Sequence, residues 1–419
     1  MTIALGIALA LLAALLYGNL SAGERRVTHE IPHLYPVDDP QFYRSMGMLL
    51  GPDIVGGNRV RALNNGDEIF PAMLEAIRAA RKTVLFETFI YWSGAIGEEF
   101  AQALSERARA GVKVHVLLDW VGSLKVDNRL VETMRDAGVE VHRFHPLRWY
   151  NLGRINNRTH RKLLIVDGRV GFTGGVGIAP PWTGHAQDEE HWRDSHYRVE
   201  GPVVAQMQGV MLSNWSKTTG RILHGEDYFP PPREAGTQQA QMFHSSPSGG
   251  SESMQLMYLI AITASVKTLD IASAYFVPDP MARVALVAAL KRGVRVRVIT
   301  PGRKIDQQTV RHASRALWGE LLEAGLEMYV YQPTMYHCKM VLADGLLSSV
   351  GSTNFDPRSF HLNDEANLNV YDHEFAAHLT QVFEEDLRRC QRVTLQDWQR
   401  RPPLEKARER MAAWLAPVL

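Results

Sequence analysis

Two stretches of this chain repeat one spacing of histidine, lysine and aspartate. Both follow the pattern HxKxxxxD, with His160, Lys162 and Asp167 in the first copy, and His337, Lys339 and Asp344 in the second. Each aspartate is followed seven residues later by a glycine, Gly174 and Gly351. A single match of this kind is weak evidence, but two copies with matching flanks indicate that the chain contains a duplicated half.

Two histidines and two lysines together suit displacement at a phosphodiester. A neutral imidazole can attack phosphorus to form a phosphohistidine, and a protonated imidazole can donate to the leaving alkoxide. An ordinary histidine pKa of about 6.5 allows either state near neutral pH. The lysines can hold the nonbridging oxygens, whose negative charge grows in the transition state. No metal-ligand spacing occurs in the sequence, so we expect neither a metal nor another cofactor.

The flanking sequence predicts how these residues are carried. His160 and Lys162 are two positions apart, so on a strand they project from one face. The apolar runs LLIV and MVLA come next, and the Asp-Gly pairs at 167 and 344 are hairpin-turn signals. All six motif residues form the candidate catalytic set. Within it, we expect Asp167 and Asp344 chiefly to fix the turns, because they lie too far along a strand to reach the same substrate atom.

Helices and strands alternate in the same order in both halves. In the first half, periodicity predicts helices through Phe70 to Ala80, at 96–110 and at 129–137. It predicts strands between and after them, at 83–92, 112–120 and 139–144. The stretches AITASVKTLDIASAYFVPD, ALKRGVRVRVITPG and EAGLEMYVY repeat this order in the second half. The expected fold is therefore two tandem α/β repeats with largely parallel sheets.

Composition and segment boundaries complete this outline. The chain has 419 residues, of which 45% are hydrophobic and 22% charged, and a net charge of +1 that disfavours a nucleic-acid partner. We expect a membrane anchor at 1–22, a linker at 23–60, a first domain at 61–220, a second linker at 221–252, a second domain at 253–400 and an amphipathic tail at 401–419.

The anchor is predicted from residues 3–22, which contain no charged side chain over about the length that spans a bilayer. A cleaved signal peptide is the alternative, but no basic residue precedes the apolar run and no clear cleavage site follows it. Arg25 and Arg26 come after the run, so the positive-inside rule places the rest of the chain in the cytoplasm.

Both HxKxxxxD copies, with GSTNFDPRSFHLNDEANL behind the second, resemble the phospholipase D superfamily. ETFIYWSG, LLDWVGS, YFVPD and RVEGPVV resemble its bacterial cardiolipin synthase branch, and the resemblance covers about residues 60 to 400. It implies two repeats about a pseudo-two-fold axis and metal-free phosphatidyl transfer. On this resemblance, His160 is the nucleophile, His337 is the acid and then the base, and Lys162 and Lys339 hold the phosphate.

Aligning the two halves identifies further candidates. DSHYRVEG aligns with EANLNVYD, which pairs Asp194 with Glu365, and the family has an acidic residue here facing the motif histidine. A carboxylate in that position fixes the histidine tautomer and stabilises imidazolium; the alternative is a surface acid in each half. Ser352 and Asn354 match the family's phosphate-pocket motif, whereas Gly175 and Gly177 occupy those positions in the first half. There, backbone N–H groups replace the missing side chains, or the pocket is wider.

Aromatic residues outside the motifs allow two interpretations each. Trp182, His185, His191 and Trp192 either line the site entrance or pack a loop. The segment 144–154 and the tail, with Leu404, Met411, Trp414, Leu415 and Val418 on one side, either lie at a lipid interface or, for the tail, pack on the protein's own domain.

The sequence thus favours a transphosphatidylase of the bacterial inner membrane with phospholipid substrates. Cardiolipin synthesis from two phosphatidylglycerols is the leading hypothesis. The alternatives are a phospholipase D that hydrolyses or uses another acceptor, a nuclease or other phosphodiesterase, and a non-catalytic lipid-binding membrane protein. The sequence does not define the oligomeric state.

Overall fold

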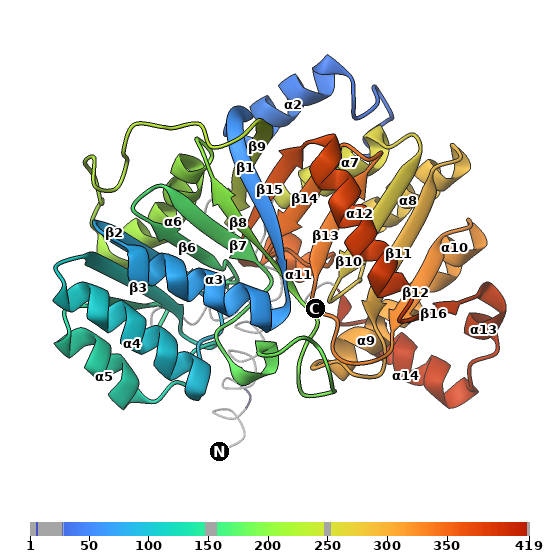
Figure 1. The fold of residues 1–419 in the computed structure, drawn as a ribbon. Helices are drawn as coiled ribbons and strands as arrows, with labels where there is room; N and C mark the ends of the chain where they lie inside the picture. The colour runs from blue at the N-terminus through green and yellow to red at the C-terminus, as the bar shows by residue number, and fades with distance from the viewer. Residues whose placement is uncertain (1–5, 7–26, 28, 147–156, 247–252, 417–419) are drawn as a thin grey trace.

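A computed structural model describes residues 6, 27, 29–146, 157–246 and 253–416 (Figure 1). The predicted anchor at 1–22 lies outside this range except for Gly6, as do most of segment 144–154 and Val418. Within the described part of the chain, no helix has both the length and the apolar character needed to cross a bilayer.

The two halves repeat one order of elements, as the sequence predicts. The first half, after α2 (Pro40–Leu50), comprises β1 (Val55–Asn64), α3 (Asn65–Ala79), β2 (Thr83–Thr88), α4 (Ala95–Arg109), β3 (Lys113–Asp119), α5 (Asn128–Asp136), β4 (Glu140–Phe144), β5 (Arg158–Thr159), β6 (Leu163–Val166), β7 (Val170–Gly174), β8 (Ser195–Glu200) and α6 (Val204–Thr219). A short 3₁₀ turn, η2 (Pro180–Trp182), precedes β8.

The second half begins at a strand equivalent to β1. It comprises β9 (Gln238–Ser245), α7 (Ser253–Ala264), β10 (Thr268–Ser273), α8 (Pro280–Lys291), β11 (Arg295–Pro301), α9 (Gln308–Ala316), α10 (Trp318–Glu323), β12 (Glu327–Tyr331), β13 (Lys339–Ala343), β14 (Leu347–Gly351), α11 (Pro357–His361), β15 (Asn363–Tyr371) and α12 (His373–Leu387). The chain then adds β16 (Cys390–Val393), α13 (Leu395–Gln399) and α14 (Pro403–Ala413). The stretches 23–60 and 221–252 therefore carry α2, part of β1, and β9.

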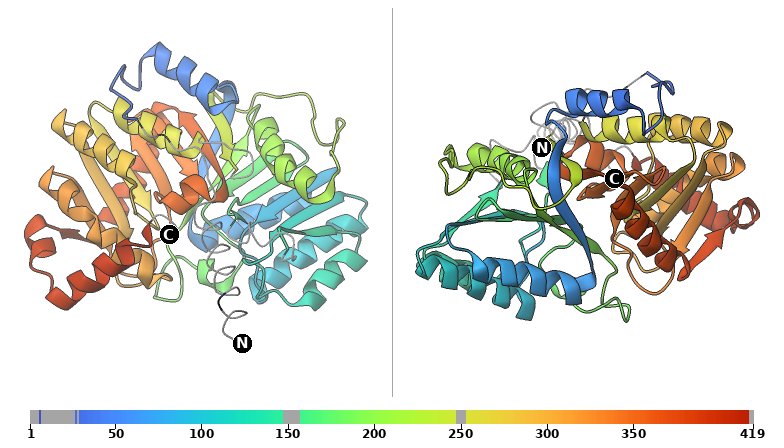
Figure 2. Two further views of the ribbon diagram at one scale, coloured as in Figure 1. Left: turned by 180° about the vertical axis from the view of Figure 1, so that it is seen from behind. Right: turned by 45° about the horizontal axis from the view of Figure 1, so that its top comes forward.

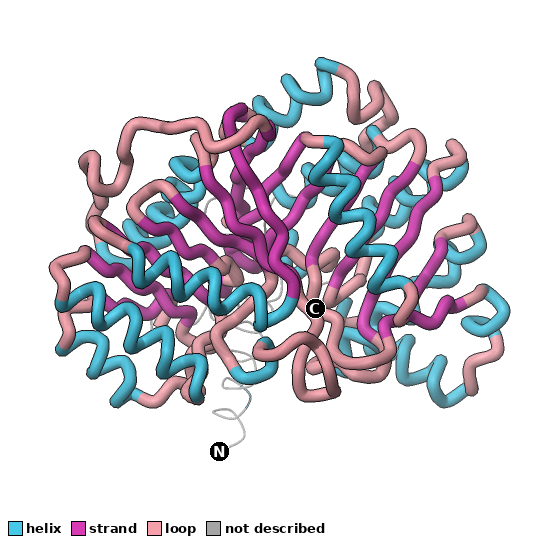
Figure 3. The backbone as a smooth tube through the Cα atoms, in the orientation of Figure 1, coloured by secondary structure: helices cyan, strands magenta, loops and turns pink. Residues whose placement is uncertain are grey.

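One sheet runs through both halves (Figure 3). Its order is β16-β12-β11-β10-β13-β14-β15-β9-β1-β8-β7-β6-β2-β3-β4, so β9 and β1 join the halves at its centre. The expectation of largely parallel sheets is wrong: only β2-β3-β4 and β10-β11-β12 are parallel among the main-path strands. The tight Asp-Gly turns reverse the chain directly, so β6-β7 and β13-β14 are antiparallel hairpins.

Helices cover both faces of this sheet, so its strands are apolar on both sides. In β2, Val84 and Phe86 pack with α3 and α4, while Leu85 faces the opposite way, into a core that also holds Trp215 of α6. That second core includes Phe383 of α12, so it continues from one half into the other. Figure 2 shows the two halves side by side. This shared core holds the strands that carry the motif residues in a fixed relation.

Candidate active site

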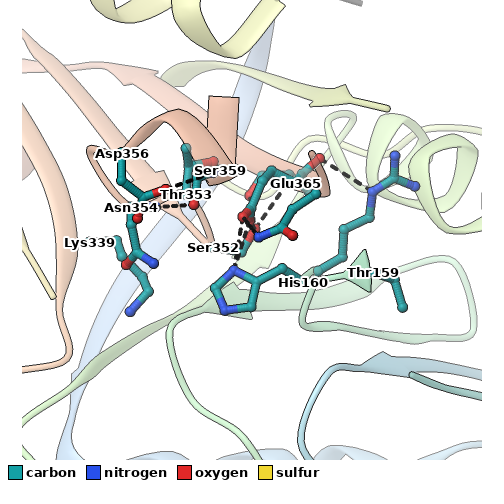
Figure 4. Close-up of polar contacts among 12 residues, drawn as sticks. Thr159, His160, Lys339, Ser352, Thr353, Asn354, Asp356, Ser359 and Glu365 are labelled. Carbon is teal, nitrogen blue, oxygen red and sulfur yellow. Dashed lines mark hydrogen bonds and ion pairs between the residues drawn. The ribbon is translucent and has the colours of Figure 1, made fainter. Parts of the chain in front are cut away.

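Each motif histidine is hydrogen-bonded to a carboxylate from the other half. His160 Nδ1 lies 2.9 Å from Oε1 and 3.1 Å from Oε2 of Glu365 (Figure 4). His337 Nδ1 lies 2.7 Å from Oδ2 of Asp194. Asp194 and Glu365, which the alignment of the halves predicts to be equivalent, thus each contact the motif histidine of the other half, and we call these two contacts crossed. Each half therefore supplies the carboxylate that the histidine of the other half contacts.

Backbone pairing fixes this crossed arrangement. The His160 N–H donates to the Asp364 carbonyl at 2.9 Å, and the His337 N–H donates to the Arg193 carbonyl at 2.7 Å. Each acceptor is the residue immediately before the pairing carboxylate. The histidines consequently lie outside the strands: His160 and Lys162 occupy the extended segment between β5 and β6, and Lys339 is the first residue of β13. The prediction that a strand carries the His-Lys pairs is therefore wrong in detail, because this segment pairs across the interface instead.

The two lysines are buried beside the histidines. Each Nζ donates to the carbonyl of its own motif histidine at 2.6 Å. Lys339 Nζ also lies 3.0 Å and 3.1 Å from the two ring nitrogens of His337. Burial lowers the pKa of Lys162 to about 7, and burial also lowers the pKa of Lys339. An ammonium held in this way is desolvated and available to an incoming anion.

Burial dominates the titration of both imidazoles. It lowers the pKa of His160 to about 4, against the opposing effect of Glu365. Burial and the neighbouring Lys339 lower the pKa of His337 to about 3. Both rings are therefore neutral at pH 7 without substrate, with the proton on Nδ1 facing a carboxylate. The side chains keep 11% and 8% of their surface exposed, so a reactant can reach them.

The two carboxylates are ionised and held differently. Burial alone would raise their pKa values, but the facing histidine and the lysines outweigh burial and lower both. Glu365 accepts from the Ser352 hydroxyl at 2.5 Å and from Asn363 Nδ2 at 3.2 Å. Asp194 accepts from Trp182 Nε1 at 2.9 Å. The tryptophan thus supplies the donor that a serine supplies in the second half.

Gly175 and Gly177 of the first half lie where a side chain would collide with neighbouring residues. A Cβ on Gly175 would lie 2.2 Å from Asp194 Oδ1, and one on Gly177 would lie 2.7 Å from the Ile90 Cβ. The N–H of Gly175 already donates to the Ser195 carbonyl at 3.1 Å. It is therefore not available to a phosphate, contrary to the first of the two alternatives predicted from the sequence. Close packing, rather than a free backbone donor, explains this glycine.

Ser352 and Asn354 also differ from simple phosphate ligands. The Ser352 hydroxyl is used by Glu365, and its N–H donates to the Ala366 carbonyl. Asn354 is buried, and its Oδ1 has no hydrogen-bond partner among the described residues. Of these two candidates, Asn354 has the side chain that is still able to bind a ligand.

The motif aspartates lie outside the candidate site. Asp167 Oδ1 accepts from the N–H groups of Lys82 and Thr83 at 2.7 Å and 2.9 Å, and Asp344 makes the same contacts to Lys267 and Thr268 at 2.7 Å and 2.8 Å. Both lie at the end of their strand remote from the histidine, with φ near +52° and +51°. Their inclusion in the catalytic set is corrected: they tie the hairpin to the start of the neighbouring strand.

An aromatic wall covers His337. The ring centroids of Trp182 and Trp192 lie 5.3 Å and 5.5 Å from the His337 centroid, and 4.6 Å from each other. The His160 ring instead forms a T-shaped pair with Phe89, with the ring centroids 5.1 Å apart. Both tryptophans therefore line the site, whereas His185 and His191 pair with the exposed Asp67 and Asp188. Of the two alternatives that the sequence left open for these four residues, lining the site therefore applies to Trp182 and Trp192.

The described part of the chain contains no group of three or more His, Cys, Asp or Glu side chains placed to hold a metal ion. The polar groups that converge here are imidazoles, ammonium groups and carboxylates. Together they can attack a phosphodiester, transfer a proton and balance the charge of a nonbridging oxygen.

Comparison with known proteins extends this picture to the whole chain. Residues 73–191 and 258–387 match a family model described as cardiolipin synthase, phospholipase D-like domain. A cardiolipin synthase of Geobacillus kaustophilus is 36% identical over 365 residues, covering 86% of this chain and 72% of the relative. Cardiolipin synthase A of Pseudomonas putida is 35% identical over 379 residues, covering 90% and 78%.

Among solved structures, a phosphatidylserine synthase from Haemophilus influenzae has a similar fold. The TM-score is 0.67 at 14% sequence identity, over 90% of this chain and 99% of that one. At this identity, the likeness concerns the fold alone, and it extends over both repeats.

Proposed function

The chain belongs to the cardiolipin synthase family with phospholipase D-like domains, and we propose that it joins two phosphatidylglycerols into cardiolipin, with release of glycerol, through a phosphohistidine on His160. It is a phospholipase D-type transphosphatidylase that acts on phospholipids. The observation that carries the proposed chemistry is the pair of crossed histidine-carboxylate contacts, His160 with Glu365 and His337 with Asp194.

The first step forms the covalent intermediate. Neutral His160, with its Nδ1 proton directed at Glu365, attacks phosphorus through Nε2, and the bond from phosphorus to the glycerol oxygen breaks. The leaving glycerol takes a proton from His337. Glu365 stabilises the positive charge that forms on the His160 ring.

Charge balance explains how His337 becomes an acid. The site residues include two lysines and two carboxylates, so their net charge is zero when both lysines are protonated and both imidazoles are neutral. A bound phosphodiester brings one negative charge, which favours a proton on His337 between that anion and Asp194. Substrate binding thus supplies the protonation state that burial by itself disfavours.

The second step reverses these roles. The glycerol hydroxyl of a second phosphatidylglycerol gives its proton to His337 and attacks phosphorus, which returns His160 to its neutral state. Water can make the same attack and would release phosphatidic acid. The Trp182 and Trp192 rings beside His337 offer water few hydrogen-bond partners at the base, which favours an alcohol that the rest of its own lipid holds there.

The membrane assignment forms part of this proposal. Residues 3–22 have the composition of a bilayer-spanning helix, which would hold the two repeats on the cytoplasmic side of the bacterial inner membrane. Anchoring keeps the site next to both lipid substrates.

The test incubates purified full-length protein with phosphatidylglycerol vesicles in EDTA and follows lipids by mass spectrometry. We expect cardiolipin and glycerol in equal amounts, lost in His160→Ala and His337→Ala and retained in the exposed control His185→Ala. Phosphatidic acid as the sole product would indicate a hydrolase. Activity in EDTA that survives both histidine substitutions would overturn the proposed chemistry.

A further inference from the structure

The C-terminal helix α14 packs on the protein through its charged side. Glu405 pairs with Arg315, which lies near the end of α9, and Glu409 pairs with Arg401. Arg315 Nε lies 3.4 Å from Glu409 as well. Glu409 is only 1% exposed, and Ala412 on the same side is also buried. The face that α14 turns to its own domain is therefore ionic.

The opposite face of α14 is apolar and open to solvent. Leu404 and Met411 of α14 are 65% and 64% exposed, and Trp414 and Leu415 in the turn that follows the helix are 87% and 49% exposed. At about 100° per residue, Leu404 and Met411 project within roughly 20° of each other around the helix axis, on the side away from Glu409. Trp414 is the C-cap residue and keeps helical backbone angles, so it continues this side. An ordinary surface helix buries its apolar stripe and exposes its charges. In α14 this orientation is reversed, so the apolar face has no partner within the described chain.

Arginines border this apolar face on both edges. Arg408 and Arg410 are exposed and project on either side of the stripe formed by Leu404, Met411 and Trp414. An apolar face flanked by basic side chains is the pattern of a helix that lies in the boundary between headgroups and acyl chains. Trp414 suits that depth because its ring is apolar and its N–H is polar.

A second copy of the chain is less well suited than a lipid surface to cover the apolar face of α14. Two α14 helices packed through this face would bring Arg408 and Arg410 of one copy next to those of the other, and like charges in contact repel. An anionic lipid surface neutralises the same arginines. Figure 1 shows α14 and α9 together at the lower edge of the second half, where a flat surface can reach them.

We infer that α14 is an interfacial helix that inserts Leu404, Met411, Trp414 and Leu415 into the headgroup region of an anionic phospholipid bilayer. This goes beyond the proposed reaction and does not depend on which phospholipid reacts. The partly exposed ion pair of Glu405 with Arg315 and the buried pair of Glu409 with Arg401 tie the helix to the second half, so its insertion would orient the catalytic repeats relative to the membrane.

The test places an environment-sensitive dye on full-length protein reconstituted in vesicles. Two labelling positions are compared, because a membrane anchor alone would hold both near the bilayer without inserting either. Ala407→Cys labels the exposed face of α14, and the exposed Gln396→Cys in α13 is the matched control. In vesicles containing phosphatidylglycerol, we expect a blue shift and quenching by brominated acyl chains at position 407 and neither at 396. Equal responses at both positions, or none at 407, would overturn the inference.

Further variants and conditions distinguish lipid insertion from contact with a second copy and from a failure of the proposed function. Arg408→Gln should weaken insertion about fivefold, as expected for one arginine near an anionic surface. A dye shift at 407 that depends on protein concentration and needs no lipid would indicate a second copy instead. Met411→Ser with Trp414→Ser should lower activity on vesicles but not on dispersed short-chain phosphatidylglycerol. Equal activity of this variant and the parent on both substrates contradicts the docking role, whereas no activity of the parent on either contradicts the proposed function.

Discussion

Lys162 should set the alkaline limit of the reaction. Its pKa is lowered to about 7 by burial, so its charge is present below that pH and is lost as pH rises through it. Because kcat/KM reports groups of the free enzyme, we expect it to fall above about pH 7. Lys162→Arg should move this limb upward, since arginine does not deprotonate in this range.

The measurement is a pH profile of kcat/KM for the parent, Lys162→Arg, and Lys339→Arg as the matched variant in the other half. A limb that moves with Lys339 instead, or with neither, would contradict the assignment to Lys162.

Trp182 should act as a positioning residue for Asp194. Trp182→Phe keeps an aromatic ring beside His337 but removes the Nε1–H donor at 2.9 Å from the Asp194 carboxylate. A hydrogen bond to a charged group contributes about 1.5–3 kcal/mol, so kcat should fall roughly tenfold or more with KM little changed. Trp192→Phe, whose ring also contacts His337 but makes no bond to Asp194, is the control for kcat and KM measurements. Equal losses in the two variants would indicate that only ring packing matters.

At the scale of elements, buried ion pairs brace the two carboxylate segments. Arg193 Nε donates to Asp386 of α12 at 2.9 Å, while Asp364 lies 3.6 Å from Arg161 and 3.9 Å from Lys217 of α6. The charges are exchanged between the halves, but the geometry is the same: a helix of each half holds the segment of the other half that pairs with the histidine of the helix's own half.

Asp386→Ala should therefore destabilise the fold. It leaves Arg193 buried without its carboxylate, and removing one partner of a buried pair typically costs about 3–5 kcal/mol. Denaturant unfolding in detergent, compared with the exposed Asp188→Ala, measures this loss. A change in the free energy of unfolding below about 1 kcal/mol would mean that solvent or another group compensates.

Sequence periodicity predicted the elements better than their pairing. The helices expected at 96–110 and 129–137 are found at Ala95–Arg109 and Asn128–Asp136, because apolar positions three and four residues apart and closing glycines define them locally. Strand direction was missed, and so were α2, β1 and β9, whose patterns are weak without their neighbours. The equivalence of Asp194 and Glu365 was accessible by aligning the repeats, but the histidine that each one serves depends on contacts more than 140 residues apart.

At the scale of the whole molecule, the crossed contacts predict that each carboxylate acts on the half to which it does not belong. The attacking His160 depends on Glu365, and the proton-transferring His337 depends on Asp194. A phosphatidyl ester of p-nitrophenol separates the two steps, because nitrophenolate leaves without a proton. With this substrate, His337→Asn should release a burst of one equivalent and stop as a phosphatidyl adduct on His160, whereas His160→Asn should give no burst.

Asp194→Asn should then behave like His337→Asn, and Glu365→Gln like His160→Asn, although each pair of variants lies in different halves. Losing the carboxylate beside a catalytic histidine lowers turnover about 10³–10⁴-fold in comparable triads, so the affected step should be clearly resolved. Stopped-flow absorbance measures the burst, and mass spectrometry of the intact protein locates the adduct. If Asp194→Asn abolishes the burst while Glu365→Gln preserves it, the carboxylates serve the histidines of their own halves, and the two repeats are not the interdependent unit that the crossed contacts describe.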